Sequence, residues 1–181
     1  MKGIVFSELI EMVEEVFSPE VADQIIHQAD LPSGGAYTAV GTYDHAEILE
    51  LVSQLSQVTG MPVADLVKAF GRHLAARFTQ LYPGFFEGVS GTLAFLQTIE
   101  GHVHVEVHKL YPDAELPSFT VEPGDGQRMT MVYRSRRPFA DLAEGLIGGA
   151  AAHFGERLDI DRVDGRDGDF HVATFNLAIA S

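Results

Sequence analysis

The chain has 181 residues, no cysteine and a formal net charge of −14 at pH 7. This length is typical of one domain with a substantial buried core, and we expect residues 1–181 to form a single domain. Without cysteine there is no disulfide and no thiolate ligand, so a metal would need histidine, carboxylate or a cofactor. The acidic balance argues against nucleic acid as a partner, because phosphate contacts need clustered lysine and arginine.

The sequence also argues against a membrane protein. No stretch is apolar over the length of about 20 residues that a membrane span requires. The N-terminal segment MKGIVFSELIEMVEE soon brings in glutamates, and no small-residue cleavage site follows an apolar core. We therefore expect a cytoplasmic protein with no membrane partner.

The first half of the sequence predicts helices, because apolar residues recur there at helical spacing. The expected helices span residues 6–17, 18–29, 45–59 and 62–82. Ser18 suits the N-cap of the second helix, and Pro19 suits its first position. Asp44 can cap the third helix, which Gly60 ends. Glycine and proline predict a loop over residues 31–43.

The second half changes in character and predicts a sheet. Residues 118–136 are typical of two strands joined by a glycine-rich turn, 138–158 of a helix, and 169–180 of a further strand. Five aspartates lie before this last strand and at its first residue, but their spacing does not fit a calcium loop, and we expect a solvated hairpin turn: Asp159, Asp161, Asp164, Asp167 and Asp169. Helices followed by strands indicate an α+β fold.

The segment IEGHVHVEVHKLYP concentrates histidine and raises the question of helix or strand. On a strand, His102, His104 and His108 would share one face with Glu106, as in a metal site. On a helix, only His104 and His108 lie on neighbouring turns. The apolar residues are three or four positions apart, which favours a helix over residues 91–111: Leu93, Leu96, Ile99, Val103, Val107 and Leu110.

The stretch YRSRR contains a Tyr-x-Ser-x-Arg motif, formed by Tyr133, Ser135 and Arg137. Arginine offers a planar fork of donors that suits a carboxylate, and the two hydroxyls add further donors. At alternate positions of a strand, the three side chains would face the same side. Together with the segment KLYPDAELP and the N-terminal MKG, this motif resembles the haem-nitric-oxide/oxygen-binding (H-NOX) family, which is related to the haem domain of soluble guanylate cyclase.

The resemblance covers the whole chain and implies a haem protein. It implies an N-terminal helical part packed against a C-terminal part with a long ligand-bearing helix and an antiparallel sheet, and haem b (iron protoporphyrin IX) buried between them. His104 falls in the register of the family's proximal iron ligand, and His102 is a rival that would need an insertion. The Tyr-x-Ser-x-Arg motif would hold the haem propionates, and Pro117 would pack against the haem.

The resemblance also places apolar residues around the haem. The candidate lining residues, taken by position, are Val5, Leu9, Leu74, Phe78, Leu142 and Leu146. Oxygen-binding members place a distal tyrosine where this sequence has Leu142, and the chain contains no tryptophan. Bound oxygen needs a hydrogen-bond donor and nitric oxide does not. The resemblance therefore implies binding of nitric oxide and carbon monoxide at ferrous iron, with exclusion of oxygen.

A gas sensor, rather than an enzyme, is the implied function. Nitric oxide would release His104 from the iron, and the signal would pass to a separate partner, usually a histidine kinase or a cyclic-di-GMP enzyme. The runner-up is a non-haem metalloenzyme that uses His104 and His108, and it would need a third ligand. The zinc-protease pattern has a glutamate directly after its first histidine, whereas Val105 follows His104.

Overall fold

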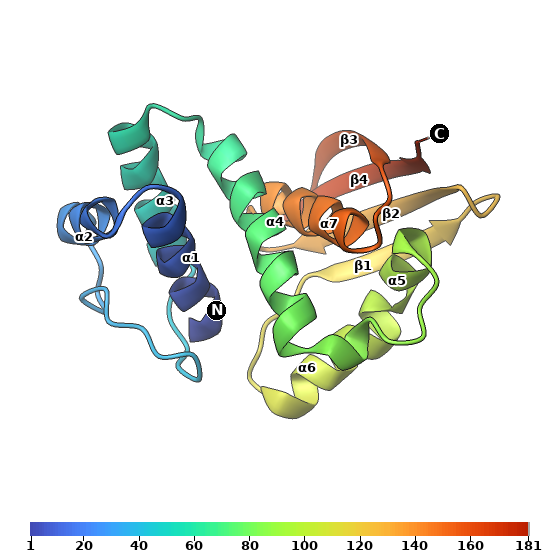
Figure 1. Ribbon diagram of the computed structural model, residues 1–181. Coiled ribbons are helices and arrows are strands. Elements are labelled where there is room, and N and C mark those ends of the chain that lie inside the picture. The colour runs from blue at the N-terminus through green and yellow to red at the C-terminus, as the bar shows by residue number, and fades with distance from the viewer. Residues whose placement is uncertain (181) are drawn as a thin grey trace. The chain divides into compact units, whose positions relative to one another are not determined.

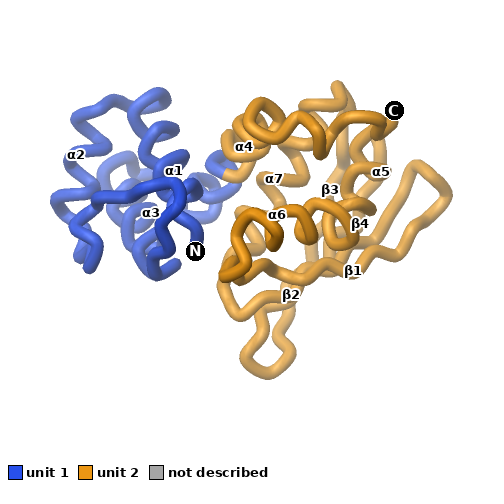
Figure 2. Tube along the Cα trace, turned by 90° about the horizontal axis from the view of Figure 1, so that it is seen from below, with its two compact units in different colours: residues 1–70 blue, residues 71–181 orange. Residues whose placement is uncertain are grey.

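The computed structural model describes residues 1–180, which divide into two compact units (Figure 2). The first unit comprises residues 1–70, and the second begins at Gly71. The chain passes from one unit to the next within helix α4 (Val63–Leu81). Each unit contains fully buried apolar side chains, among them Phe6 in the first and Phe175 in the second.

Helices make up the first unit, and their ends follow the predicted caps. They are α1 (Gly3–Val16), α2 (Pro19–Gln28), α3 (Ala46–Thr59) and the start of α4. The Oγ of Ser18 accepts a hydrogen bond from the N–H of Val21 at 3.3 Å, as an N-cap does. The Asp44 carboxylate accepts from the N–H of Ala46 at 2.9 Å at the start of α3. Gly60 ends α3 with a φ of 74°.

The segment between α2 and α3 packs against α1 through aromatic rings. Tyr37 stacks on Phe6 with ring centroids 4.5 Å apart, and Tyr43 meets both rings at steep angles. The buried Glu47 carboxylate, in the first turn of α3, accepts hydrogen bonds from the hydroxyls of Ser33 and Tyr37. The predicted loop is therefore tied to α1 and to α3.

The second unit contains a four-stranded antiparallel sheet with the strand order β1-β2-β4-β3 (Figure 1). The strands are β1 (Ser118–Pro123), β2 (Arg128–Ser135), β3 (Leu158–Asp167) and β4 (Phe170–Ile179). β1 and β2 form the predicted hairpin around a glycine-rich turn, and β4 is the predicted final strand. The α+β class is confirmed.

Helices cover one face of this sheet. The second unit holds the rest of α4, a 3₁₀ turn (Pro83–Phe85), α5 (Thr92–Thr98), a π-helical turn (Ile99–Val103), α6 (His104–Leu110) and α7 (Ala140–His153). Buried side chains of α5 and α7, such as Phe95 and Ile147, pack against Met131 and Phe175 of the sheet. Burial of this apolar surface stabilises the unit.

Two glycines allow α4 and α7 to approach closely within the second unit. A Cβ atom on Gly71 would lie 2.5 Å from the carbonyl oxygen of Leu142, and one on Gly149 would lie 2.5 Å from the Cβ of Ala75. Both distances are shorter than van der Waals contact. The helix crossing therefore requires residues without a side chain at these positions.

The acidic segment before the final strand is a strand, and the prediction of a hairpin turn was wrong for most of it. Residues 158–167 pair with β4 along their whole length, and the turn is confined to Gly168 and Asp169. β3 is an edge strand, where charged side chains face solvent and discourage pairing with another chain. The aspartates thus mark an exposed sheet edge.

Candidate functional site

His104 lies on a helical run that extends from Thr92 to Leu110 through α5, the π-helical turn and α6. The prediction of a helix, rather than a strand, is confirmed. The sequence did not reveal the π-helical turn, in which the N–H of His104 bonds to the carbonyl of Ile99. Such turns are rare and are frequently found at functional sites.

The His104 imidazole is held by a carboxylate. Its Nδ1 lies 3.1 Å from Oε2 of Glu100, one turn earlier on the helix, and the side chain is only 15% exposed. Burial lowers the pKa of His104, and the charge of Glu100 opposes this shift. A neutral ring that donates its Nδ1–H keeps the lone pair of Nε2 for a metal. Glu100 is the only hydrogen-bond partner of this ring within residues 1–180.

Phe119 connects His104 to the Tyr-x-Ser-x-Arg motif. The Phe119 ring, on β1, lies 5.8 Å from the His104 ring and 5.7 Å from the Tyr133 ring, centroid to centroid. Its backbone N–H donates to the same Glu100 oxygen at 3.0 Å. The structure therefore brings the predicted iron ligand and the start of the predicted propionate motif into contact with the same aromatic ring. Sequence reasoning missed both Glu100 and Phe119.

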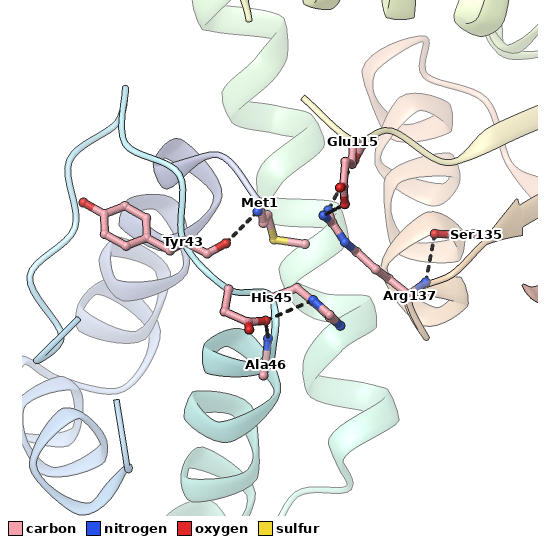
Figure 3. Close-up of polar contacts among 8 residues, drawn as sticks. Met1, Tyr43, His45, Ala46, Glu115, Ser135 and Arg137 are labelled. Carbon is pink, nitrogen blue, oxygen red and sulfur yellow. Dashed lines mark hydrogen bonds and ion pairs between the residues drawn. The ribbon is translucent and has the colours of Figure 1, made fainter. Parts of the chain in front are cut away.

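The motif itself combines the end of a strand with a turn. Tyr133 and Ser135 lie on β2, but Arg137 lies two residues beyond its end, so the expectation that all three share a strand face was wrong. The Tyr133 hydroxyl donates to the carbonyl of Arg137 at 2.8 Å. Ser135 Oγ accepts from the N–H of Arg137 at 3.1 Å, as Figure 3 shows. The two hydroxyls thus fix the turn that presents the arginine.

The Arg137 guanidinium binds a carboxylate. One of its nitrogens pairs with the Glu115 carboxylate, and another donates to the Glu115 carbonyl at 3.2 Å (Figure 3). The Arg137 side chain is 16% exposed, whereas that of Glu115 is 79% exposed. The guanidinium therefore has the geometry and position to hold an acidic group, which is the chemistry that a haem propionate requires. Glu115 was not a predicted site residue.

The neighbouring histidines are less suited to ligation. His102 and His108 are exposed, and the ring of His102 meets Phe85 at a steep angle. Within residues 1–180, no three histidine, aspartate or glutamate side chains converge on a common point as metal ligands. The non-haem alternative therefore lacks the third ligand that it needs in the described part of the chain.

The predicted lining residues divide between the two units. Leu9 is buried in the core of the first unit, and Val5, also on α1, is half-buried. In the second unit Leu74 is buried on α4. The others are half-buried, on α4, on α7 and just before β1: Phe78, Leu142, Leu146 and Pro117. The role of these residues at a haem stays a prediction.

A family model described as Haem-NO-binding matches residues 2–162, which include His104 and the whole Tyr-x-Ser-x-Arg motif. The chain belongs to this H-NOX family. Domains of the family bind haem and act as gas sensors, not as enzymes. The resemblance stated from the sequence is thereby confirmed.

Solved H-NOX structures agree with this assignment. The Fe(II) unliganded H-NOX protein from K. algicida and a mutant of it are 35% and 36% identical to this chain, each with a TM-score of 0.92 over 100% of this chain and 97% of theirs. An S. oneidensis H-NOX protein in the Fe(II)NO state is 26% identical, with a TM-score of 0.90 and full coverage of both chains. A mutant T. tengcongensis H-NOX, at 22% identity and a TM-score of 0.89 over 100% of this chain and 98% of its own, shares the fold.

The H-NOX chain has no helix, among the residues described, that is both long enough and apolar enough to cross a bilayer.

Proposed function

We propose that residues 1–181 act as one haem-binding domain that senses nitric oxide, with His104 as the ligand of a haem b iron. The state of the His104 ring is the observation that carries this proposal. Its Nδ1 is bound to Glu100 at 3.1 Å, so Nε2 is the nitrogen with a lone pair to share. Burial lowers the pKa of the ring, which favours the neutral form that a metal requires.

The turn around Arg137 supports haem binding because it presents a guanidinium that can bind the haem propionates. In this proposal Arg137 binds a propionate with the fork that contacts Glu115 in the structure. Tyr133 and Ser135 hold the backbone of Arg137 on both sides and keep the fork in place. Pro117 follows Glu115 by two residues and would contact the haem at the end of the same segment.

Ligand selectivity follows from the proposed distal side. Its residues carry no hydrogen-bond donor on their side chains: Val5, Leu9, Leu74, Phe78, Leu142 and Leu146. At a bound haem, oxygen would need a hydrogen-bond donor beside it, whereas nitric oxide and carbon monoxide would not. We therefore expect the domain to bind nitric oxide and carbon monoxide and to exclude oxygen.

Signalling would begin with the release of His104. His104 would hold the haem iron, which would supply the site for nitric oxide, and loss of the bond to His104 would leave the helix that carries this residue free to shift. A ligand that favours one of two conformations in this way provides the coupling that a sensor requires. The output would pass to a separate cytoplasmic partner, a histidine kinase or a cyclic-di-GMP enzyme.

Absorption spectra of two matched histidine variants test the proposal. His104→Gly should lose the spectrum of histidine-bound ferrous haem and regain it when free imidazole is added. His108→Gly, one turn further along the same helix and exposed, should keep the wild-type spectrum. An unchanged spectrum in His104→Gly would assign the iron to another ligand. A stable oxygen complex of the ferrous wild-type protein would contradict the proposed selectivity.

A further inference from the structure

One oxygen of Glu100 accepts two hydrogen bonds from different elements of the second unit. Oε2 lies 3.1 Å from Nδ1 of His104, on the ligand helix, and 3.0 Å from the backbone nitrogen of Phe119, on β1. The two donors thus belong to a helix and to a strand that follows it. A single carboxylate oxygen therefore links the imidazole of the ligand helix to the first strand of the sheet.

We propose that Glu100 is a positioning residue of the haem site, which sets the tautomer and ring orientation of His104 and couples its helix to β1. This inference rests on the proposed haem ligation by His104. It adds a residue that acts through the ligand and does not touch the iron. Through this coupling, a movement of His104 would change the hydrogen bonding of β1.

The chemistry of the imidazole gives the carboxylate this role. A histidine that donates one ring N–H to a carboxylate has a fixed tautomer, and its other nitrogen becomes a stronger ligand. Loss of such a partner typically lowers metal affinity by about 10–100-fold. Glu100 meets the geometric requirement because its Oε2 lies within hydrogen-bond distance of Nδ1, while Nε2 has no partner within residues 1–180.

The helix geometry supports the same role. Glu100 lies inside the π-helical turn, and the N–H of His104 closes that turn on the carbonyl of Ile99. The turn inserts an extra residue into the helix and so sets the rotational position of every residue after it. The Glu100 carboxylate is half-exposed, at 50%, and so remains able to exchange its two donors when the helix moves. Movement of His104 would therefore change the hydrogen bond that the N–H of Phe119 donates to Glu100.

Another glutamate on the same helical run provides a matched control. Glu106 lies two residues after His104, its side chain is 34% exposed, and its carboxylate binds Lys109 at 2.6 Å. It has the same charge as Glu100 and lies on the same helical run, on the other side of His104 in the sequence. Glu106→Gln therefore controls for the loss of one negative charge near the site.

Three variants separate charge from geometry. Glu100→Gln removes the charge but keeps an oxygen that can accept both hydrogen bonds, Glu100→Ala removes both, and Glu100→Asp shortens the side chain. In ferrous haem-loaded protein, the iron–histidine stretching frequency should fall in the order wild type, Gln variant, Ala variant. Haem transfer to apomyoglobin should be about 10–100-fold faster for the Ala variant, with partial recovery in Asp. Glu106→Gln should match the wild type.

Haem-free protein supplies a readout that does not depend on haem ligation. Nitrogen-15 NMR of His104 should show the Nδ1–H tautomer in the wild type and a mixture of tautomers in Glu100→Ala. The amide hydrogen of Phe119 should exchange with solvent faster in Glu100→Ala than in the wild type. Its exchange rate should be unchanged in Glu106→Gln. Wild-type tautomer and exchange in Glu100→Ala would overturn the inference. If His104→Gly retained a wild-type haem spectrum, the proposed function would fail, while the haem-free measurements would still decide on Glu100.

Discussion

Two glutamates, one in each unit, use the same hydrogen-bonding arrangement in opposite surroundings. Oε2 of Glu47 accepts from the hydroxyls of Ser33 and Tyr37, and Oε2 of Glu100 accepts from His104 and Phe119. Glu47 is 5% exposed, whereas the side chain of Glu100 is 50% exposed. A buried carboxylate must be satisfied for the fold to form, while a half-exposed one can exchange water for protein donors at little expense.

The difference extends to the units as a whole. In the first unit the described polar contacts of Glu47 join a loop to a helix, and no arginine is present in residues 1–70. In the second unit polar groups are presented by a π-helical turn and by a turn after a strand, around His104 and Arg137. We conclude that the buried Glu47 stabilises the fold of the first unit, whereas the polar groups of the second orient His104 and Arg137, the residues to which the proposed function assigns the haem.

Loss of a central aromatic ring should give the largest effect and sets the scale of stability for each unit. Phe6 and Phe175 are 0% exposed, and Phe6→Ala or Phe175→Ala should lower the free energy of unfolding by about 3–5 kcal/mol. The exposed Val16 and Val163, at 64% and 58%, provide controls whose change to alanine should stay within about 0.5 kcal/mol. Urea unfolding measures all four. Equal losses in core and control variants would contradict the burial pattern.

The two glutamates should separate stability from ligand chemistry. Glu47→Ala leaves two hydroxyls without their acceptor and should lower the free energy of unfolding by about 1–3 kcal/mol, with no change in the spectrum of bound haem. Glu100→Ala should change stability by about 0.5 kcal/mol and alter the iron–histidine vibration. Urea unfolding and resonance Raman spectra measure the two effects. If Glu47→Ala and Glu100→Ala each changed both the free energy of unfolding and the iron–histidine vibration, the two glutamates would not have the separate roles inferred for them.

The close approach of α4 and α7 is tested by adjacent glycines. A Cβ on Gly149 would lie 2.5 Å from Ala75 Cβ, so Gly149→Ala should destabilise the protein by about 1–3 kcal/mol. A Cβ on Gly148 would have only Arg72 Cγ nearby, at 4.0 Å. Gly148→Ala should therefore raise stability by up to about 1 kcal/mol, because alanine favours a helix. Thermal melting compares the two variants. If both lowered the melting temperature by the same amount, the close packing of α4 against α7 would not explain the loss of stability.

A pH-dependent effect is expected in alkali. Burial raises the pKa of Tyr37 to about 12, whereas an unfolded tyrosine loses its proton near pH 10. Between these values the unfolded chain binds fewer protons than the folded one, so stability should fall as pH rises from about 10 to about 12. Urea unfolding across this range should show a shallower fall for Tyr37→Phe. Identical pH profiles of wild type and variant would mean that Tyr37 ionises freely in the folded state.

Much of the fold was accessible from local patterns. Ser18, Asp44 and Gly60 lie at the helix ends where they were predicted, because capping depends on a few adjacent residues. The helix around His104 followed from the spacing of apolar residues over several turns. β3 was missed because an edge strand can be polar on its exposed side and then resembles a loop.

By itself, the sequence determined the α+β class, the helix that bears His104 and the motif that indicates the H-NOX family, since these depend on periodicity and short spacings. Only the tertiary structure decided that Glu100 holds both His104 and Phe119, and that Arg137 leaves the strand to meet Glu115. The physical reason is that a hydrogen bond between elements depends on how they pack in space. Residues 19 positions apart, such as Glu100 and Phe119, share no local pattern.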